Sequence, residues 1–258
     1  MLSRGEVMLN PPLVAFFIAL QFLTRIPLPP IPGSSESRNF ARATLAFPLI
    51  GLVIGLILVL SQWVFNGFSE MLQAALVVTV WVWITGNLHL DGLADSADAW
   101  IGGQGSKERT LEIMKDPTSG PTAISAVVLT ILLKFTAVYA VLEINPWLLI
   151  LPPIIARTLL LPWFMTAPYV RHDGLASVFV RDLNSSHAWL AASLTALVLM
   201  LLFGGDLIYV IAVAAGVMAL WRYLGMRRIG GFTGDTSGAM VEMVEVAVLI
   251  LVLSMGIG

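Results

Sequence analysis

Residues 71–142 read MLQAALVVTVWVWITGNLHL, then DGLADSADAWIGGQGSKERTLEIMKDPTSG, then PTAISAVVLTILLKFTAVYAVL, so that a strongly charged stretch lies between two apolar segments. Residues 71–90 contain no Asp, Glu, Lys or Arg, and residues 43–69 contain none either. Each segment provides the ~20 residues that an α-helix needs to cross a bilayer. Both segments are therefore predicted to span a membrane.

The composition of the whole chain agrees with this prediction. Of the 258 residues, 58% are hydrophobic and 12% are charged, and the mean hydropathy is +0.89. Soluble domains have roughly 45–50% apolar and about 25% charged residues. Further apolar segments cover residues 121–142, 146–164, 187–203, 207–224 and 239–257. We therefore expect an all-α fold, a polytopic membrane helical bundle with about seven transmembrane helices, in which residues 1–258 form a single integral membrane domain.

A shorter apolar segment stands near the N-terminus. Residues 10–24 are too few to cross a bilayer, and they open with Pro11-Pro12. The segment is therefore predicted to be a short N-terminal re-entrant or interfacial helix rather than a further span.

The basic residues predict which way the bundle faces, because cytoplasmic loops accumulate Lys and Arg. Four long connections contain such residues: 24–42, 91–120, 169–183 and 222–238. The intervening turns contain none: 66–70, 143–145 and 204–206. We therefore expect a multi-pass protein of the cell (inner) membrane whose active-site loops lie on the cytoplasmic side.

Scarce residue types exclude several classes of site. The chain has no Cys, which excludes disulfides, thiolate catalysis and Cys-based zinc or iron–sulfur sites. Its three His residues include no close-spaced pair, which argues against zinc. The expected partners are small molecules and membrane lipid. No nucleic acid is expected, and a homo-oligomer is left open.

Residues 89–120 contain six carboxylates and three basic groups. On a helix, Asp91, Asp95 and Asp98 stand at i, i+4 and i+7, so they share one face within two turns. Like charges this close repel unless a cation or a proton lies among them. Oxygen-only ligands favour Mg²⁺ or Mn²⁺, and Mg²⁺ commonly binds one or two carboxylates together with substrate phosphates. The pattern predicts a Mg²⁺ site.

The second half of the same stretch repeats the pattern. Glu112 and Asp116 are four residues apart on what is expected to be a second helix, with Lys115 between them. Arg109 and Lys115 are expected to neutralise phosphate oxygens, and His89 to act as an acid–base group or as the partner of a metal ligand. The alternative is a solvated polar loop whose charges pair with each other. The predicted metal ligands are Asp91, Asp95, Asp98, Glu112 and Asp116.

Residues 227–245 read RRIGGFTGDTSGAMVEMVE, a glycine-rich loop that leads into an apolar helix. Gly231 and Gly234 let the backbone approach a ligand closely, and Asp235 lies among hydroxyl residues. The loop is therefore predicted to contact a phosphate or a nucleotide. It is not a P-loop, because no GK[ST] follows at the required spacing. The alternative is a tight turn between two helices.

Lys134, Arg157, Glu242 and Glu245 fall inside predicted spans, where an unpaired charge is expensive. Glu242 and Glu245 need partners, either a basic residue or a substrate hydroxyl. Lys134 is expected to find an acid or a phosphate, to pair with Glu143, or to snorkel. Arg157 heads a segment that runs back to the cytoplasmic side, and it is expected to contact phosphate.

A resemblance to a known family rests first on three motifs in order: GNLHLDGLADSADAW (86–100), RTLEIMKDPTSGPTA (109–123) and GGFTGDTSGAMVE (230–242). Three further segments extend it along most of the chain: LQFLTRIPLP (20–29), FPLIG (47–51) and APYVRHDGLA (167–176). Together they resemble the cobalamin synthase family, the adenosylcobinamide-GDP ribazoletransferases. The chain departs from the family pattern at Ala99-Trp100, where a Gly is usual, and at Pro117, in a segment that usually reads MKDSxxG.

The resemblance implies a reaction, a cofactor and substrates. α-Ribazole, or its 5′-phosphate, would displace GMP from adenosylcobinamide-GDP with Mg²⁺, giving adenosylcobalamin or its 5′-phosphate. Carboxylates from two helices would hold the metal against the diphosphate. The residues predicted to take part in catalysis are His89, Asp91, Asp95 and Asp98. The residues predicted to contact the substrate are Arg109, Lys115, Arg157, Gly231, Gly234, Asp235 and Glu242.

Two other functions stay open. The segment DGLAD (91–95) is distantly similar to the DGxxAR of CDP-alcohol phosphotransferases, membrane enzymes that cleave a nucleotide diphosphate with paired carboxylates. A secondary transporter also has charged residues within its spans. Transporters usually place their site near the midplane and contain repeats, whereas this sequence clusters its acids at a membrane boundary and has no repeated halves.

Overall fold

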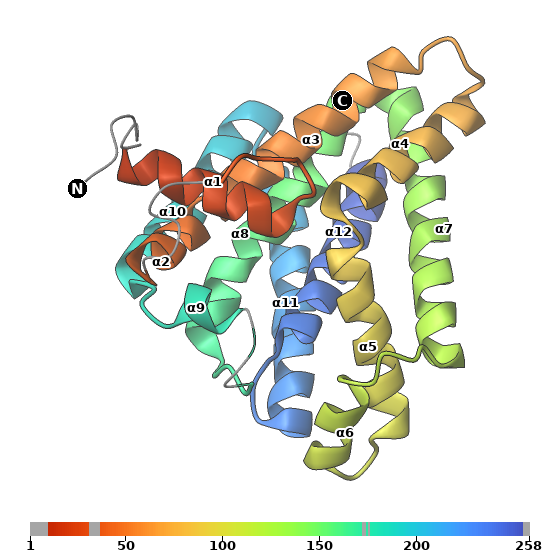
Figure 1. Cartoon of the computed structure of the whole chain (residues 1–258). Helices are drawn as coiled ribbons and strands as arrows, with labels where there is room; N and C mark the ends of the chain where they lie inside the picture. The colour runs from red at the N-terminus through yellow and green to blue at the C-terminus, as the bar shows by residue number, and fades with distance from the viewer. Residues whose placement is uncertain (1–9, 31–36, 172–173, 175, 255–258) are drawn as a thin grey trace.

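A computed structural model describes residues 10–30, 37–171, 174 and 176–254 as a bundle of helices (Figure 1). Its elements in chain order are α1 (Pro11–Leu23), α2 (Ser37–Leu45), α3 (Phe47–Val64), α4 (Glu70–Thr85), α5 (Leu88–Gly102), α6 (Lys107–Ile113), α7 (Pro121–Ile144), the 3-10 turn η1 (Pro146–Ile150), α8 (Leu151–Thr166), α9 (Ser177–Val180), α10 (Ser185–Phe203), α11 (Leu207–Ile229) and α12 (Gly234–Ser254). Parts of the expected basic connections (31–36, 172–173 and 175) and the end of the last expected span (255–257) lie outside the described residues.

The number of membrane-spanning segments agrees with the sequence. Within the described part of the chain, six segments are long and apolar enough to cross a membrane: α3, α7, η1 with α8, α10, α11 and α12. Helices α4 and α5 form a seventh if the bent pair counts as one span. The expectation of about seven transmembrane helices is confirmed.

The expected span over residues 71–90 is wrong in one respect, because it is not one continuous helix. Helix α4 ends at Thr85, and the axis turns by 85° before α5 begins at Leu88. Gly86 and Asn87 between them have φ angles of 60° and 59°. Residues in this left-handed conformation end a helix, and glycine followed by asparagine adopts it readily. The turn sends the acidic residues of α5 along the bundle instead of away from it.

The centre of the bundle is the segment formed by η1 and α8, of which 94% is buried, and α12, of which 67% is buried. The outer helices are much less buried: α7 by 22%, α11 by 17% and α10 by 11%. Their large exposed side chains are apolar, as expected of helices that face lipid. Helix α12 is thus held on all sides by α5, α7, α8 and α11.

Two glycines of α3 allow it to lie directly against the central segment. A Cβ atom on Gly51 would stand 2.4 Å from the carbonyl oxygen of Pro153, and one on Gly55 would stand 2.7 Å from Ile150 Cα. Small residues at such contacts let two helix backbones approach closely in a membrane. These contacts fix η1 and α8 in the centre of the bundle, where α8 contributes Leu160 and Phe164 to the candidate site.

The N-terminal region contains one expected helix and one that was not expected. Helix α1 has 13 residues, too few to cross a bilayer, in agreement with the prediction of a short re-entrant or interfacial helix. Helix α2, which follows it, was not among the predicted elements. Both helices pack on each other and on α3, and the end of α1 brings Phe22 and Leu23 to the site.

Candidate functional site

The segment after α8 and the loop before α12 are joined by backbone hydrogen bonds. The Val170 amide donates to the Phe232 carbonyl at 2.9 Å, and the Phe232 amide donates to the Pro168 carbonyl at 2.9 Å. Tyr169 and Phe232 thereby form an isolated parallel bridge. A Cβ atom on Gly231 would stand only 2.1 Å from the Pro168 carbonyl oxygen, so the contact requires glycine. Two connections that are far apart in sequence thus meet.

A second close approach places α5 beside the start of α12. A Cβ atom on Gly92 would stand 2.6 Å from the Asp235 carbonyl oxygen, and one on Gly238 would stand 3.1 Å from His89 Cα. Glycines at both positions therefore allow the two backbones to touch. The consequence is that His89 and Asp91 of the acidic helix lie next to Asp235 of the glycine-rich loop.

A cavity of about 210 Å³ opens at this meeting point. Side chains from α1, α3 and α8 make one wall apolar, with Leu23, Phe47, Leu160 and Phe164 among them. The other wall is polar and comes from α5, from the segment after α8 and from the start of α12. Its polar side chains are His89, Asp91, Tyr169, Arg171, Asp235 and Ser237, and Gly234 also lines it.

Negative charge is concentrated at the polar wall. The charges of Asp91, Asp98 and Asp235 all act on the carboxylate of Asp95, and Arg171 opposes them. Within the described part of the chain, the carboxylates of Asp91 and Asp95 make no hydrogen bond and no ion pair. These two acids stand one turn apart on α5; Asp91 lines the cavity, whereas Asp95 lies next to it in the helix and does not line it.

Arg171 was not among the predicted site residues. Its Nη1 lies 2.6 Å from Asp235 Oδ2, while its buried Nε and Nη2 have no hydrogen-bond partner among the described residues. Burial raises the pKa of the neighbouring Tyr169 phenol, although the charge of Arg171 opposes this rise. The sequence signal was present in APYVRHDGLA, because Arg171 is the basic residue of that motif.

Asp98 lies on the expected face of α5, but its carboxylate is hydrogen-bonded to the start of another helix, α7. Its Oδ2 accepts a hydrogen bond from the Gly120 amide, and its Oδ1 accepts one from the Ala123 amide at 2.9 Å. These amides belong to the first turn of α7, where backbone N–H groups lack partners within the helix. Asp98 therefore caps α7 from a neighbouring helix.

The second acidic helix differs from the prediction. Helix α6 ends at Ile113, so Glu112 lies in its last turn and Asp116 lies beyond it; the expectation that both stand on one helix is wrong. Asp116 instead accepts hydrogen bonds from the Thr118 amide and hydroxyl, which lower its pKa. A carboxylate that bonds the backbone two residues ahead favours a turn over a continued helix.

Four of the predicted site residues lie on the exposed surface, away from the cavity. Arg109 Nη1 and Glu112 Oε2 pair with each other at 2.8 Å on the exposed surface. Lys115 and Asp116 are exposed as well, and none of the four lines the cavity. Among the described residues, no three Asp, Glu or His side chains are grouped closely enough to hold a metal ion by themselves.

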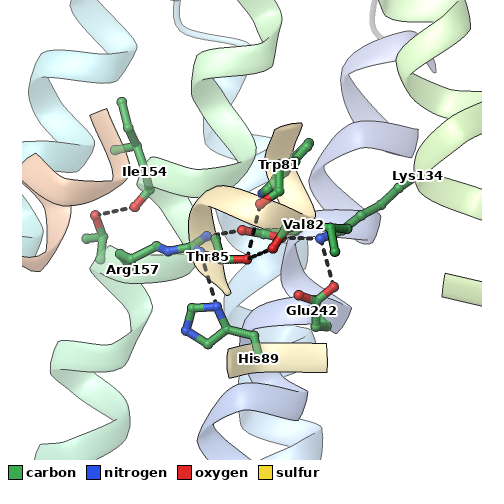
Figure 2. A network of polar contacts seen from close by, with 10 residues as sticks. Trp81, Val82, Thr85, His89, Lys134, Ile154, Arg157 and Glu242 are labelled. Carbon is green, nitrogen blue, oxygen red and sulfur yellow. Dashed lines mark hydrogen bonds and ion pairs between the residues drawn. The ribbon is translucent and has the colours of Figure 1, made fainter. Parts of the chain in front are cut away.

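Next to the cavity, a network of buried charges that includes His89 joins four helices (Figure 2). Lys134 Nζ of α7 lies 2.7 Å from Glu242 Oε2 and also pairs with Glu245, both on α12. Arg157 of α8 pairs with Glu245, and its Nη2 lies 3.2 Å from His89 Nδ1. The expectation that Lys134 finds an acid is confirmed, and so is a basic partner for Glu242 and Glu245, whereas Glu143 is not the partner of Lys134. Arg157 and Glu242 lie in this network and do not line the cavity.

Residues 15–253 match the cobalamin-5-phosphate synthase family. The chain belongs to this family. Among its relatives, the adenosylcobinamide-GDP ribazoletransferase of Pseudomonas putida (strain W619) is 46% identical over 241 residues, covering 92% of this chain and 98% of that protein. The enzyme of the same name from Stutzerimonas stutzeri (strain A1501) is 44% identical over 239 residues, covering 92% and 97%. No solved structure matches the chain. The resemblance expected from the acidic and glycine-rich motifs is confirmed, and the match extends along nearly the whole of this chain.

Proposed function

We propose that this member of the cobalamin-5-phosphate synthase family is a Mg²⁺-dependent transferase. It joins α-ribazole or α-ribazole 5′-phosphate to adenosylcobinamide-GDP and releases GMP. The transferase activity is supported by family membership and by the names of relatives that match 92% of the chain. The observation that carries the proposed site is the free carboxylate of Asp91, which lines the cavity with Arg171 and Asp235, together with the free carboxylate of Asp95 one turn further along α5.

The donor set fits magnesium. Asp91 and Asp95 offer two carboxylates without protein partners, and Mg²⁺ commonly binds one or two carboxylates while phosphate oxygens of the substrate complete its shell. A bound Mg²⁺ would neutralise negative charge on the diphosphate and on the departing GMP. The lack of a three-residue ligand group among the described residues agrees with a site that substrate phosphates complete.

Arg171 is the residue that we assign to the diphosphate. It is fixed on one side by Asp235, and its Nε and Nη2 have no protein acceptor. A guanidinium presents its N–H donors in a planar fork that matches two oxygens of a phosphate. Arg171 thus orients the diphosphate over the carboxylates of α5. The apolar wall opposite, from Phe47 and Phe164, excludes water from the reacting groups.

The site faces the cytoplasm in this proposal. The polar wall of the cavity comes from three regions that contain Lys or Arg: the stretch after α4, the segment after α8, and the loop before α12 with the end of α11 that precedes it. Cytoplasmic connections of membrane proteins carry such residues. Nucleotide-linked substrates would then reach the cavity from the side on which they are made.

The family match favours cobalamin synthesis over a CDP-alcohol phosphotransferase and over a secondary transporter. The decisive experiment is to incubate the purified protein in lipid nanodiscs with adenosylcobinamide-GDP, α-ribazole 5′-phosphate and Mg²⁺. Release of GMP together with a cobalamin product is expected, and chelation of Mg²⁺ should stop it reversibly. Parallel assays with α-ribazole identify the preferred acceptor.

Each alternative gives a different result in the same preparation. Phospholipid formed from a CDP-linked donor would support the CDP-alcohol enzyme. Substrate movement across proteoliposomes without bond cleavage would support transport. Either outcome, without GMP release, contradicts the proposed function.

A further inference from the structure

A hydrogen bond joins Arg157 of α8 to His89 of α5. Arg157 has no exposed surface, and His89 is only 4% exposed. Arg157 Nη2 lies 3.2 Å from His89 Nδ1, and a dashed line marks this contact in Figure 2. This contact links the buried charges in the middle of the bundle to a side chain in the wall of the cavity.

The chemistry of the two groups determines the direction of this hydrogen bond. A guanidinium has five N–H donors and no acceptor, and it keeps its charge in proteins. His89 Nδ1 must therefore be the acceptor, and it carries no proton. An imidazole whose Nδ1 is bare has its proton on Nε2. The contact with Arg157 thus selects one of the two tautomers of His89.

The orientation of Arg157 is itself fixed. Its Nη1 pairs with Glu245, which also pairs with Lys134, and Lys134 lies 2.7 Å from Glu242. The ammonium group of Lys134 stands 4.5 Å from the centre of the Trp81 ring. Two buried cations and two buried anions therefore balance across α7, α8 and α12. The arrangement is held together because the loss of any one partner would leave a buried charge uncompensated.

The other nitrogen of His89 remains for a ligand. His89 lines the cavity together with Asp91, Arg171 and Asp235, and its Nε2 makes no hydrogen bond within the described residues. We infer that the buried network positions His89 as an Nε2–H hydrogen-bond donor to the substrate diphosphate, with Arg157, Glu245 and Lys134 as positioning residues. The identity of the acceptor rests on the proposed function. His89 in this role donates to a phosphoryl oxygen and does not take the proton of the incoming hydroxyl.

The tautomer is measured directly, without substrate. The protein is labelled with ¹⁵N-histidine in nanodiscs, and the His89 signals are those that disappear in His89→Gln. A bare Nδ1 and a protonated Nε2 are expected. A protonated Nδ1 in the wild-type protein overturns the inference. In Arg157→Lys the preference for Nε2–H should be lost, whereas Arg228→Lys, whose guanidinium binds the Trp100 and Gly103 carbonyls, should keep it. An unchanged spectrum in Arg157→Lys contradicts the positioning role.

Two substitutions of His89 separate a donor from a base during turnover. The amide nitrogen of Gln reaches as far from Cβ as Nε2, while Asn keeps only a group at the position of Nδ1. His89→Asn is expected to lower kcat for GMP release by about 10²-fold, the usual effect of losing one such donor, while His89→Gln stays within about tenfold of the wild type. Equal losses in both variants contradict the donor role. If the wild-type protein releases no GMP, the proposed function fails, and the tautomer measurement still decides the inference about Arg157 and His89.

Discussion

Asp91, Asp95 and Asp98 are equivalent by spacing on α5, yet their surroundings differ. Asp98 accepts two hydrogen bonds from the first turn of α7. Asp95 makes none within the described residues and lies in the field of Asp235 and Asp91. A carboxylate that caps a helix contributes to stability, whereas one without a partner among other acids favours a cation. The three residues are therefore expected to respond differently to substitution.

Asp95→Asn tests the metal site at the scale of one residue. The change removes the charge and keeps the shape, so Mg²⁺-dependent GMP release should fall by about a hundredfold or more, because bound metal contributes several kcal/mol to catalysis. Insertion into the membrane should be unchanged. The assay follows GMP release over a range of Mg²⁺ concentrations.

The matched control is Glu108→Gln, which removes an exposed carboxylate of α6 that accepts a hydrogen bond from the Ser106 hydroxyl. This variant should keep wild-type activity. Full activity of Asp95→Asn would show that Asp95 is not a ligand.

At the scale of elements, the site depends on the bridge between the segment after α8 and the loop before α12. Only four residues take part, and their backbone hydrogen bonds bring Arg171 and Asp235 to within 2.6 Å of each other. The Arg228 guanidinium adds a further link, since it donates to the Trp100 and Gly103 carbonyls at the end of α5. Elements α5, α8, α11 and α12 therefore hold the polar wall of the cavity together.

Gly231→Ala tests this bridge. The added methyl group would stand 2.1 Å from the Pro168 carbonyl oxygen, so the two segments must separate. We expect a loss of about 1–3 kcal/mol in stability, as for other overpacked sites, and a clear fall in activity. Thermal unfolding in detergent and GMP release measure the two effects.

Gly216→Ala in α11 is the control, because among the described residues no side chain and no other helix lies within 4 Å of the position of its Cβ. Alanine there should be neutral or slightly stabilising, since it is the better helix former. Equal behaviour of the two alanine variants would contradict the structural role of the bridge.

At the scale of the whole molecule, a membrane-spanning bundle tolerates buried charges only when they balance. Glu245 of α12 is fully buried and pairs with both Lys134 and Arg157, which come from two other helices. The network therefore links the helices at the centre of the bundle, and His89 at its end also lines the cavity.

Glu245→Ala is expected to destabilise the protein by about 3–5 kcal/mol, because it leaves buried cations unpaired. Unfolding by denaturant in mixed micelles gives this value. Glu143→Ala, which changes an exposed acid at the end of α7, should have little effect. A stable Glu245→Ala variant would mean that the network contributes nothing to the fold.

The orientation in the membrane is tested with single cysteines, since the natural chain has none. Gln104→Cys lies in the exposed connection between α5 and α6, and Asn66→Cys lies in the exposed turn between α3 and α4. A membrane-impermeant thiol reagent added outside intact cells should label Asn66→Cys and leave Gln104→Cys unlabelled until the membrane is opened. The reverse pattern would place the cavity on the outer side.

The amino-acid sequence by itself determined the membrane location, the approximate number of spans, the helix that bears Asp91, Asp95 and Asp98, and the resemblance to the cobalamin synthase family. These properties depend on hydropathy and on spacing over a few turns, which are local to the chain. Only the tertiary structure decided that Asp98 caps α7, that Arg171 joins the cavity, that Arg157 and Glu242 lie in a buried network, and that Glu112 and Asp116 stand apart from it. The physical reason is that a charge inside a bundle takes whichever partner the packing of other helices brings to it, and that partner lies, as with Lys134 and Glu245, more than a hundred residues away.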